Sequence, residues 1–454
     1  MKQVKERRDD QTASDEERED EQDLRQINIG LLGLGTVGTG VFRLIEQHQD
    51  DLQKQTGCKI SVQKILIQNV AKERHIHVDE HLLTTDPNEL IKDPDIDVIV
   101  EVMGGISNTK TYIAQALNEK KHVVTANKDL IALHGGELLT LASENECDLF
   151  YEASVAGGIP ILRALVEGFS SDRVTKIIGI LNGTTNYMLS KMSKDGLEYE
   201  DCLKQAQNLG YAEADPTSDV EGLDAARKIA ILGTLGFHTE LSLEEVDVRG
   251  ISSVSKKDID YGKEFGYELK LLATADRKNN EIELEVQPTF IPKTHPLAHV
   301  NDAFNAVFVQ GEAMGETMFY GPGAGELPTA TAVTSDLVTV VKNIKLGVNG
   351  RGTVAPYRLK KFKRKDNRYH RYFIRLIVED EPGVLAVITQ SLAQQNISVS
   401  KMVQKHYKEQ QAEIVIITHE AAQQSFENWE KEMNLYSEKI EFASYYAVEG
   451  DDSR

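Results

Sequence analysis

An unbroken apolar run near the N-terminus changes within a few residues into a helical pattern. Residues 27–32, INIGLL, are apolar enough for a strand that is buried on both faces. A glycine-rich loop, GLGTVG, follows at residues 33–38, and the apolar side chains of residues 39–49 then recur at helical spacing without an interrupting proline. The pattern predicts a buried strand, a glycine loop and a helix.

This order of elements favours a dinucleotide-binding loop over a glycine-rich turn without a ligand. Gly33 would allow the tight turn, Gly35 would let the backbone approach a pyrophosphate, and Gly38 would let helix and strand pack closely. Backbone N–H groups at the start of the helix would hold the phosphates. The candidate cofactor-binding residues in the loop are Gly33, Leu34, Gly35, Thr36, Val37 and Gly38.

Three further apolar segments predict the rest of a parallel sheet. Residues 59–67 are rich in β-branched side chains, and residues 97–102 and 121–125 are typical of buried strands with a helix, 109–120, between them. The carboxyl ends of parallel strands point to one crevice. We therefore expect the residues that follow these strands to line the nicotinamide end of the site: Gly104, Gly105, Thr125, Asn127 and Lys128.

The end of the second strand bears on the choice of cofactor. An acid there would bind the ribose 2′-OH of NAD, whereas a basic residue would accept the 2′-phosphate of NADP. Residues 68–74 read QNVAKER, with no acid at the tip and with Lys72 and Arg74 just beyond it. This favours NADP slightly over NAD, although the two cations could equally be ordinary exposed charges.

The middle of the chain combines short strands with turns of small residues. Residues 148–152 predict a short strand, followed by the turn ASVAGGIP and a helix at 161–167. Such a turn either exposes carbonyl oxygens to a hard cation or simply packs tightly, and the residues alone favour packing. A strand at 176–181 then leads through NGTTN, whose threonines suit an N-cap, into a helix at 187–192.

The densest group of ionisable residues lies between 211 and 228. Pro216 can open a turn that contains Asp219. Asp224 and Lys228 are four residues apart on a predicted helix and therefore share one face. An ordinary surface ion pair is the simplest interpretation of that spacing.

The C-terminal pattern begins again after a charged linker at residues 360–366. Strands near 372–378, 397–404, 413–418 and 440–447 and helices at 386–395 and 420–433 give a βαββαβ order. The loop after the first strand holds Pro382, Gly383, Val384 and Leu385.

Composition narrows the class of protein. A chain of 454 residues predicts two or three domains, and its formal charge of -21 argues against nucleic acid or an anionic membrane as the main partner. Residues 1–26 are acidic and nearly free of apolar side chains, so we expect a disordered tail. Three widely spaced cysteines, no membrane-length apolar run and no signal-peptide core predict a cytoplasmic protein with reduced thiols.

Several motifs in order resemble homoserine dehydrogenase over residues 27–345. They are GLGTVG (33–38), TANKDLIALHG (125–135), EASVAGGIP (152–160), LNGTTNYML (181–189), YAEADPTSDVEGLDAARKIAIL (211–232) and YGPGAGELPTATAV (320–333). The resemblance implies reversible hydride transfer between C4 of homoserine, oxidised to aspartate 4-semialdehyde, and the nicotinamide of NAD(P). An ammonium suits this chemistry because it can stabilise and protonate a developing alkoxide.

By the same resemblance, Lys228 would be the general acid, and Lys128 would bind substrate and assist proton transfer. Glu213 would hold the substrate ammonium, Asp224 would orient Lys228 and the substrate, and Asp219 would support them. Gly325 would join the cofactor site. A monovalent cation, usually sodium, would be held by backbone oxygens of Glu152, Val155, Gly157 and Ile159. Gln68 departs from NADP-preferring relatives, which tend to carry Arg there, and leaves the cofactor open.

The C-terminal order resembles an ACT domain, in which residues 382–385 would take part in binding an amino acid. Threonine is the candidate effector, and a domain that only dimerises is the alternative.

We expect an α/β chain with a Rossmann-type domain at 27–150 that the chain rejoins near 325–345, an α+β substrate and dimerisation domain at 151–324, a linker at 346–370 and the ACT domain at 371–450. The chain would form a homodimer or homotetramer. A catalytically idle NAD(P)-binding sensor and another oxidoreductase of amino-acid metabolism are the competing functions.

Overall fold

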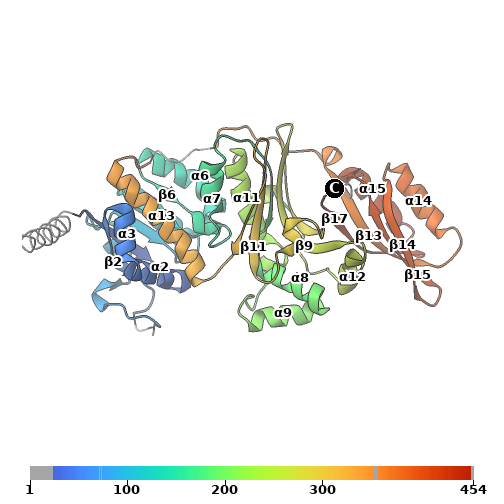
Figure 1. The fold of residues 1–454 in the computed structure, drawn as a ribbon, viewed down its shortest axis with the longest axis horizontal. Coiled ribbons are helices and arrows are strands. Elements are labelled where there is room, and N and C mark those ends of the chain that lie inside the picture. The colour runs from blue at the N-terminus through green and yellow to red at the C-terminus, as the bar shows by residue number, and fades with distance from the viewer. Residues whose placement is uncertain (1–23, 71, 73, 351–355, 451–454) are drawn as a thin grey trace, which may run out of the picture. The chain divides into compact units, whose positions relative to one another are not determined.

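The computed structural model describes residues 24–70, 72, 74–350 and 356–450 (Figure 1). They form two compact units. Unit 1 comprises Met1–Gly158 with Ala324–Ala355, and unit 2 comprises Ile159–Gly323 with Pro356–Arg454. The sequence predicts an acidic tail at residues 1–26, of which residues 1–23 lie outside the described residues. The predicted end of this tail is wrong, because the first strand begins at Gln26.

Unit 1 contains a six-stranded parallel sheet in the order β3-β2-β1-β4-β5-β6. This is the strand order of a dinucleotide-binding Rossmann fold, and it confirms the predicted α/β class. The predicted strand at 148–152 is only two residues long. The strands are β1 (Gln26–Leu32), β2 (Lys59–Leu66), β3 (Leu83–Thr84), β4 (Val98–Glu101), β5 (His122–Thr125) and β6 (Leu149–Phe150).

The long helix α13 (Glu326–Leu346) returns to unit 1 and packs beside α2 (Thr36–Gln47), as Figure 1 shows. The two helices approach closely because Gly40 has no side chain: a Cβ there would lie 2.8 Å from that of Ala330. Apolar residues of α13 also join the core formed by β1 and β2. The other helices of unit 1 are α3 (Gln49–Thr56), α4 (Asn88–Ile91), α5 (Ser107–Asn118) and α6 (Lys128–Glu144), with the 3-10 turns η1 (Glu80–Leu82) and η2 (Glu152–Ser154).

Unit 2 is built on a largely antiparallel sheet, whose main strands run in the order β12-β11-β7-β9-β10-β17-β13-β15-β14. Its first part contains β7 (Val174–Ile180), β8 (Asp247–Val248), β9 (Tyr267–Lys278), β10 (Glu281–Pro292), β11 (Phe304–Gly311) and β12 (Gly315–Pro322). The helices are α7 (Ile161–Arg163), which continues as a π-turn, η3 (Ala164–Gly168), and α8 (Gly183–Asp195), α9 (Tyr199–Asn208), α10 (Thr217–Val220), α11 (Leu223–Phe237) and α12 (Lys256–Glu264). Short 3-10 turns are η4 (Leu243–Glu245), η5 (Pro296–His299) and η6 (Lys365–Asn367).

Residues 369–448, the C-terminal segment, have the predicted βαββαβ order with one short extra strand. The elements are β13 (Tyr369–Glu379), α14 (Val384–Gln394), β14 (Val399–Lys408), β15 (Gln411–Thr418), β16 (Ala421–Ala422), α15 (Gln423–Asn434) and β17 (Ile440–Val448). β17 pairs in parallel with β10 through Thr289–Ala447 and Phe290–Val448, which makes the sheet continuous. Expecting residues 360–366 to be only a linker was wrong, because Phe362 forms a β-bridge with Ile282 on β10.

A buried ionic network ties α12 to the C-terminal segment. Arg375 on β13 donates to Asp258 at 2.5 Å and to Glu413 at 2.9 Å, and both carboxylates are fully buried. Asp258 also accepts hydrogen bonds from the hydroxyls of Ser444 and Tyr446 on β17. Burying two carboxylates is tolerable here because each is paired and hydrogen-bonded.

Candidate active site

In unit 1, the glycine loop has the geometry that the sequence predicts. Gly33 adopts a φ of +107°, which favours glycine, and its N–H bonds to Leu66 on β2. A Cβ on Gly38 would lie 2.2 Å from the carbonyl oxygen of Gly33, so the loop and α2 pack too closely for a side chain. Gly35, at the start of α2, has open space where a Cβ would be. The exposed start of α2 can therefore receive an anion.

Glu101, at the end of β4, organises the loops that follow β4 and β5. One carboxylate oxygen accepts the N–H groups of Met103 and Gly104 at 2.9 and 3.0 Å, and the other accepts the Thr125 hydroxyl at 2.5 Å. Burial raises the pKa of Glu101, and these hydrogen bonds oppose that rise. Asn127 completes the network by donating to the carbonyl oxygen of Gly105 at 2.7 Å.

The remaining cofactor candidates lie at helix ends in unit 1. Lys128 is the first residue of α6, directly after its cap Asn127, and is half-buried. Gly325 precedes α13 with a φ of +128°.

The loop beyond β2 holds the two cations that the sequence associates with NADP. The guanidinium of Arg74 donates to three backbone oxygens of this loop, those of Asn69, Val70 and Lys72. The side chain of Lys72 is exposed.

The turn proposed for a cation follows η2. Ala156 and Gly157 have φ values of +56° and +54°, and the carbonyl oxygen of Glu152 accepts a long 3.4 Å bond from the N–H of Val155. Gly157 belongs to unit 1, and Ile159 is the first residue of unit 2.

In unit 2, the structure brings Asp219, Asp224 and Lys228 together around Asn182. The Asn182 amide donates to Asp219 at 2.7 Å and to Asp224 at 2.9 Å. Lys228 donates to Asp224 at 2.7 Å and to the carbonyl oxygen of Leu181 at 2.7 Å. The Lys228 and Asp224 side chains are 11 % and 7 % exposed, so the simple surface ion pair was the wrong interpretation.

Local sequence places each member of this cluster. Asn182 caps α8 by accepting the N–H of Thr185, so the expectation that a threonine caps this helix is wrong. Gly222, with a φ of +82°, is the cap residue before α11, and helical geometry then places Asp224 and Lys228 one turn apart. Burial raises the pKa of Asp219, against which the Asn182 hydrogen bond acts. An aspartate whose pKa is raised and a nearly enclosed lysine, placed in one hydrogen-bonded cluster, are typical of sites of proton transfer.

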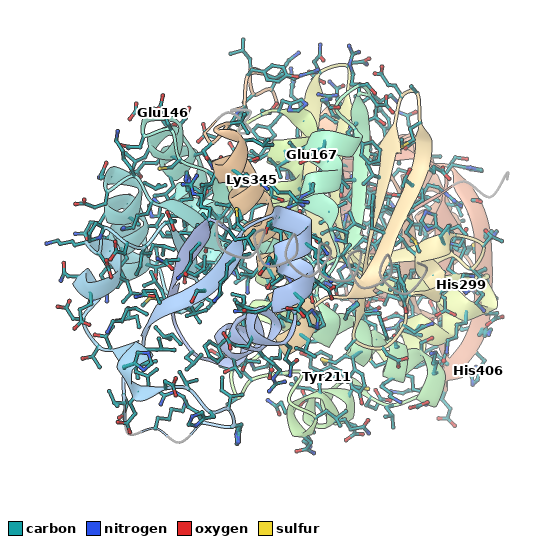
Figure 2. The ribbon with its side chains drawn as sticks, turned by 60° about the vertical axis from the view of Figure 1, so that its left-hand side comes forward. Glu146, Glu167, Tyr211, His299, Lys345 and His406 are labelled. Carbon is teal, nitrogen blue, oxygen red and sulfur yellow. The ribbon has the colours of Figure 1, made fainter. Side chains whose placement is uncertain are left out.

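Glu213 lies in the loop between α9 and α10, and its side chain is exposed. Tyr211, labelled in Figure 2, belongs to the same loop. The Thr184 hydroxyl of α8 donates to the backbone oxygen of Tyr211 at 2.6 Å, which holds the loop against the helix that Asn182 caps.

The effector candidates lie between β13 and α14 of the C-terminal segment. Gly383 adopts a φ of +102° and immediately precedes α14, while Pro382 and Gly383 are exposed and Val384 is buried.

The sequence analysis did not single out Asn182 and Glu101, two side chains that organise the candidate site through hydrogen bonds. Asn182 was part of a recognised motif, but its contacts with two carboxylates depend on a fold that joins residues 37 and 42 positions away. Glu101 had a stronger signal, since a lone acid ends an otherwise apolar strand.

Comparison with known proteins identifies one family along most of the chain. A family model described as "Homoserine dehydrogenase, NAD binding domain" matches residues 33–152, and one described as "Homoserine dehydrogenase" matches residues 160–338. A homoserine dehydrogenase of Bacillus subtilis is 51% identical over 430 residues, covering 94% of this chain and 99% of that protein.

Solved structures give the same result. A homoserine dehydrogenase from Thiobacillus denitrificans superposes with a TM-score of 0.86 at 37% identity, covering 94% of this chain and 99% of that one. A hyperthermophilic archaeal homoserine dehydrogenase in complex with NADPH matches with a TM-score of 0.59 at 26% identity, covering 69% of this chain and 97% of that one. The chain belongs to the homoserine dehydrogenase family and is an NAD(P)-dependent oxidoreductase.

Proposed function

We propose that Lys228 is the proton-transfer group of the reversible oxidation of homoserine to aspartate 4-semialdehyde. The observation that carries this proposal is the buried Asn182–Asp224–Lys228 arrangement. An ammonium has three N–H donors, and Lys228 directs two of them to Asp224 and to Leu181. The third suits the substrate oxygen, whose negative charge develops as hydride adds to the aldehyde. In the oxidative direction, Lys228 would start as the neutral amine and take the hydroxyl proton, and the bound cofactor would supply the hydride acceptor for C4.

The other site residues receive roles that match their charge. Glu213 would bind the substrate ammonium, Asp224 would orient Lys228, and Asp219 would support both through Asn182. Lys128, at the start of α6 in unit 1, would bind substrate and assist proton transfer. Glu213→Gln should therefore raise the homoserine KM more than it weakens NADPH binding, and equal effects on both ligands would count against its role.

The reaction itself is tested with homoserine that carries deuterium at C4. Wild-type protein mixed with this substrate and NADP should transfer deuterium to the nicotinamide, and the transfer should be slower than with unlabelled homoserine. The appearance of reduced cofactor without deuterium would refute hydride transfer from C4.

The preferred cofactor in this proposal is NADP, with NAD as the alternative. The exposed Lys72 beyond β2 and the absence of an acid at the strand end support it, as does the NADPH complex of the archaeal relative. Arg74 contributes less than expected because it is bonded to its own loop. Rates with the two cofactors measured side by side decide the preference.

We also propose the monovalent cation as a structural ligand. Backbone oxygens of Glu152, Val155, Gly157 and Ile159 would bind the ion. Its positive charge would stabilise the turn, and it would take no part in the reaction. The left-handed Ala156 and Gly157 support a turn that can present carbonyl oxygens. Replacing sodium by choline should lower thermal stability, and unchanged stability would remove the cation from the proposal.

Regulation is the last part of the proposal: the C-terminal segment would act as an ACT domain that binds threonine at residues 382–385 and lowers activity. Its βαββαβ order and the exposed left-handed Gly383 before α14 support this. Gly383→Ala strains that turn and should reduce inhibition by threonine without changing uninhibited turnover.

The proposal also includes assembly and location. The chain would form a homodimer or homotetramer in the cytoplasm. The buried free thiols support the cytoplasmic location: Cys58, Cys147 and Cys202.

A further inference from the structure

Two strands of unit 2 bring a histidine and two glutamates together away from the Lys228 cluster. Glu283 and Glu285 lie on β10, and His370 lies on β13 of the C-terminal segment. Their donor atoms all lie within 4.8 Å of one another. Side chains at positions 283 and 285 share a face of β10 because they are two residues apart.

The distances suit a metal ion better than hydrogen bonds. The Nε2 atom of His370 lies 3.3 Å from Oε1 of Glu283 and 3.2 Å from Oε1 of Glu285. Neither His370 Nε2 nor Glu283 Oε1 has a hydrogen-bond partner of acceptable geometry, although both atoms are buried. A tetrahedral ion with bonds of about 2.1 Å separates its ligand atoms by about 3.4 Å. Only 6 % of Glu283 is exposed, and its Oε1 atom lies within ion-pair distance of His370 and Arg368 without a hydrogen bond of good geometry, so a ligand between these groups would stabilise it.

The charges around the cluster leave room for a cation. Lys363 bonds to Glu283 at 3.0 Å but also to Asp276 at 2.8 Å. Arg368 lies 3.8 Å from Glu283 and is paired with Asp247. Glu285 has no lysine or arginine partner among the described residues. The carboxylates of Asp247, Asp276, Glu283 and Glu285 thus outnumber Lys363 and Arg368, which leaves negative charge beside His370.

The surroundings also provide an outer shell and a route for water. The amide of Gln287 donates to the second oxygen of Glu285 at 2.9 Å, which orients that carboxylate. A cavity of about 270 Å³ is lined by Glu285 and His370 and can supply a water as fourth ligand. Arg249, which also lines it, already donates to the backbone oxygen of Tyr445 at 2.7 Å.

We propose that Glu283, Glu285 and His370 form a binding site for a divalent ion of the zinc class, which joins β10 to the C-terminal segment. Imidazole and carboxylate ligands suit such an ion.

The test uses the full chain after treatment with a chelator. Titration with zinc chloride in a calorimeter should show about one Zn²⁺ bound per chain, and Co²⁺ in its place should give the visible absorption of a four-coordinate ion. Glu285→Gln and His370→Gln should each weaken zinc binding by about tenfold or more, since even outer-shell changes cost ~10- to 100-fold. His406→Gln, an exposed histidine on β14 (Figure 2), is the matched control and should bind zinc like the wild type.

Either of two results overturns the site. One is wild-type protein that binds no stoichiometric Zn²⁺ and gives no Co²⁺ absorption, which would leave a protonated His370 held between two carboxylates. The other is unchanged zinc affinity in Glu285→Gln, which preserves the shape of the side chain and is the variant to use if His370→Gln fails to fold.

Discussion

At the scale of single residues, burial decides what a lysine and an aspartate four positions apart can do. Lys191 and Asp195 on α8 form such a pair at 3.0 Å, with side chains 30 % and 47 % exposed. Lys228 and Asp224 on α11 have the same spacing but are nearly enclosed and share Asn182. Solvent screens the exposed pair, so it contributes little to stability, whereas the enclosed pair fixes the position of the Lys228 ammonium at the candidate site.

Asn182→Ala should impair both catalysis and stability. It removes the amide that bridges Asp219 and Asp224 and the oxygen that caps α8. Loss of the cap should cost about 1 kcal/mol, and misplaced catalytic groups should lower kcat by ~10- to 100-fold. Ser255→Ala, which removes the cap of α12, controls for stability and should leave kcat nearly unchanged. Equal kcat values for the two variants would show that Asn182 is only a cap.

Lys270 should make the free energy of unfolding increase with pH in the alkaline range. It is 2 % exposed, and burial lowers its pKa from 10.5 to about 8. Between pH 8 and 10.5, Lys270 is protonated in the unfolded chain but largely neutral in the folded chain. The free energy of unfolding therefore increases with pH, by up to about 1.4 kcal/mol per pH unit. Below pH 8, Lys270 is protonated in both states, and this dependence on pH ends. Urea unfolding at pH 7, 8, 9 and 10 should show this increase in wild type relative to Lys270→Met. A constant difference between the two proteins would exclude it.

The sequence indicated candidate residues of the site but not the contacts that these residues make. Asp224 and Lys228 could be placed on one helix face because i,i+4 spacing is local, and the resemblance supplied their role. Asn182 and Glu101 were missed because their partners are set by tertiary structure: Glu101 meets Thr125 on the neighbouring strand, 24 residues away.

At the scale of elements, the glycine loop allows the effect of packing to be separated from that of ligand binding. Gly35→Ala should leave the melting temperature unchanged, because no atom lies within 4 Å of its Cβ position, but should weaken NADPH binding by occupying the phosphate side of the loop. Gly38→Ala should lower stability by ~1–3 kcal/mol, because its Cβ would meet the oxygen of Gly33. Thermal melts and fluorescence titration with NADPH measure both, and normal NADPH affinity in Gly35→Ala would contradict phosphate binding at this loop.

Element types followed from periodicity, while several boundaries did not. The parallel strands β1, β2, β4 and β5 of unit 1 and the βαββαβ order at the C-terminus were both predictable from the spacing of apolar segments, whereas β3 was not predicted. α8 begins four residues earlier than expected because Asn182, rather than a threonine, caps it. The bridge between Phe362 and Ile282 was hidden because the surrounding residues are charged, as in a typical linker.

At the scale of the whole molecule, the C-terminal segment is joined to the rest of unit 2 through buried charge. Arg375→Met should cost ~3–5 kcal/mol of unfolding free energy, because it leaves Asp258 and Glu413 without their cation. Lys405→Met is the matched control: its pair with Glu264 also links α12 to the C-terminal segment but is 44 % and 49 % exposed, and its loss should cost ~0–1 kcal/mol. If chemical denaturation showed similar losses of unfolding free energy in Arg375→Met and Lys405→Met, the buried network would have no special role in stability.

The same network bears on how regulation should be studied. Deleting the residues from about Lys365 onward would expose Asp258 and remove the strand that pairs with β10. Such a truncation would lose stability together with any effector site, so point variants such as Gly383→Ala are the better test of the threonine proposal.

The central claim, that Lys228 transfers the proton, is tested most directly by the turnover of Lys228→Ala in homoserine oxidation. Lys191→Ala, which breaks the exposed pair of the same spacing, is the control. We predict that kcat falls by ~10²- to 10⁴-fold in Lys228→Ala, that NADPH affinity is unchanged, and that Lys191→Ala remains as active as the wild type. A loss smaller than about tenfold in Lys228→Ala would contradict the claim, because a general acid–base group contributes more than that.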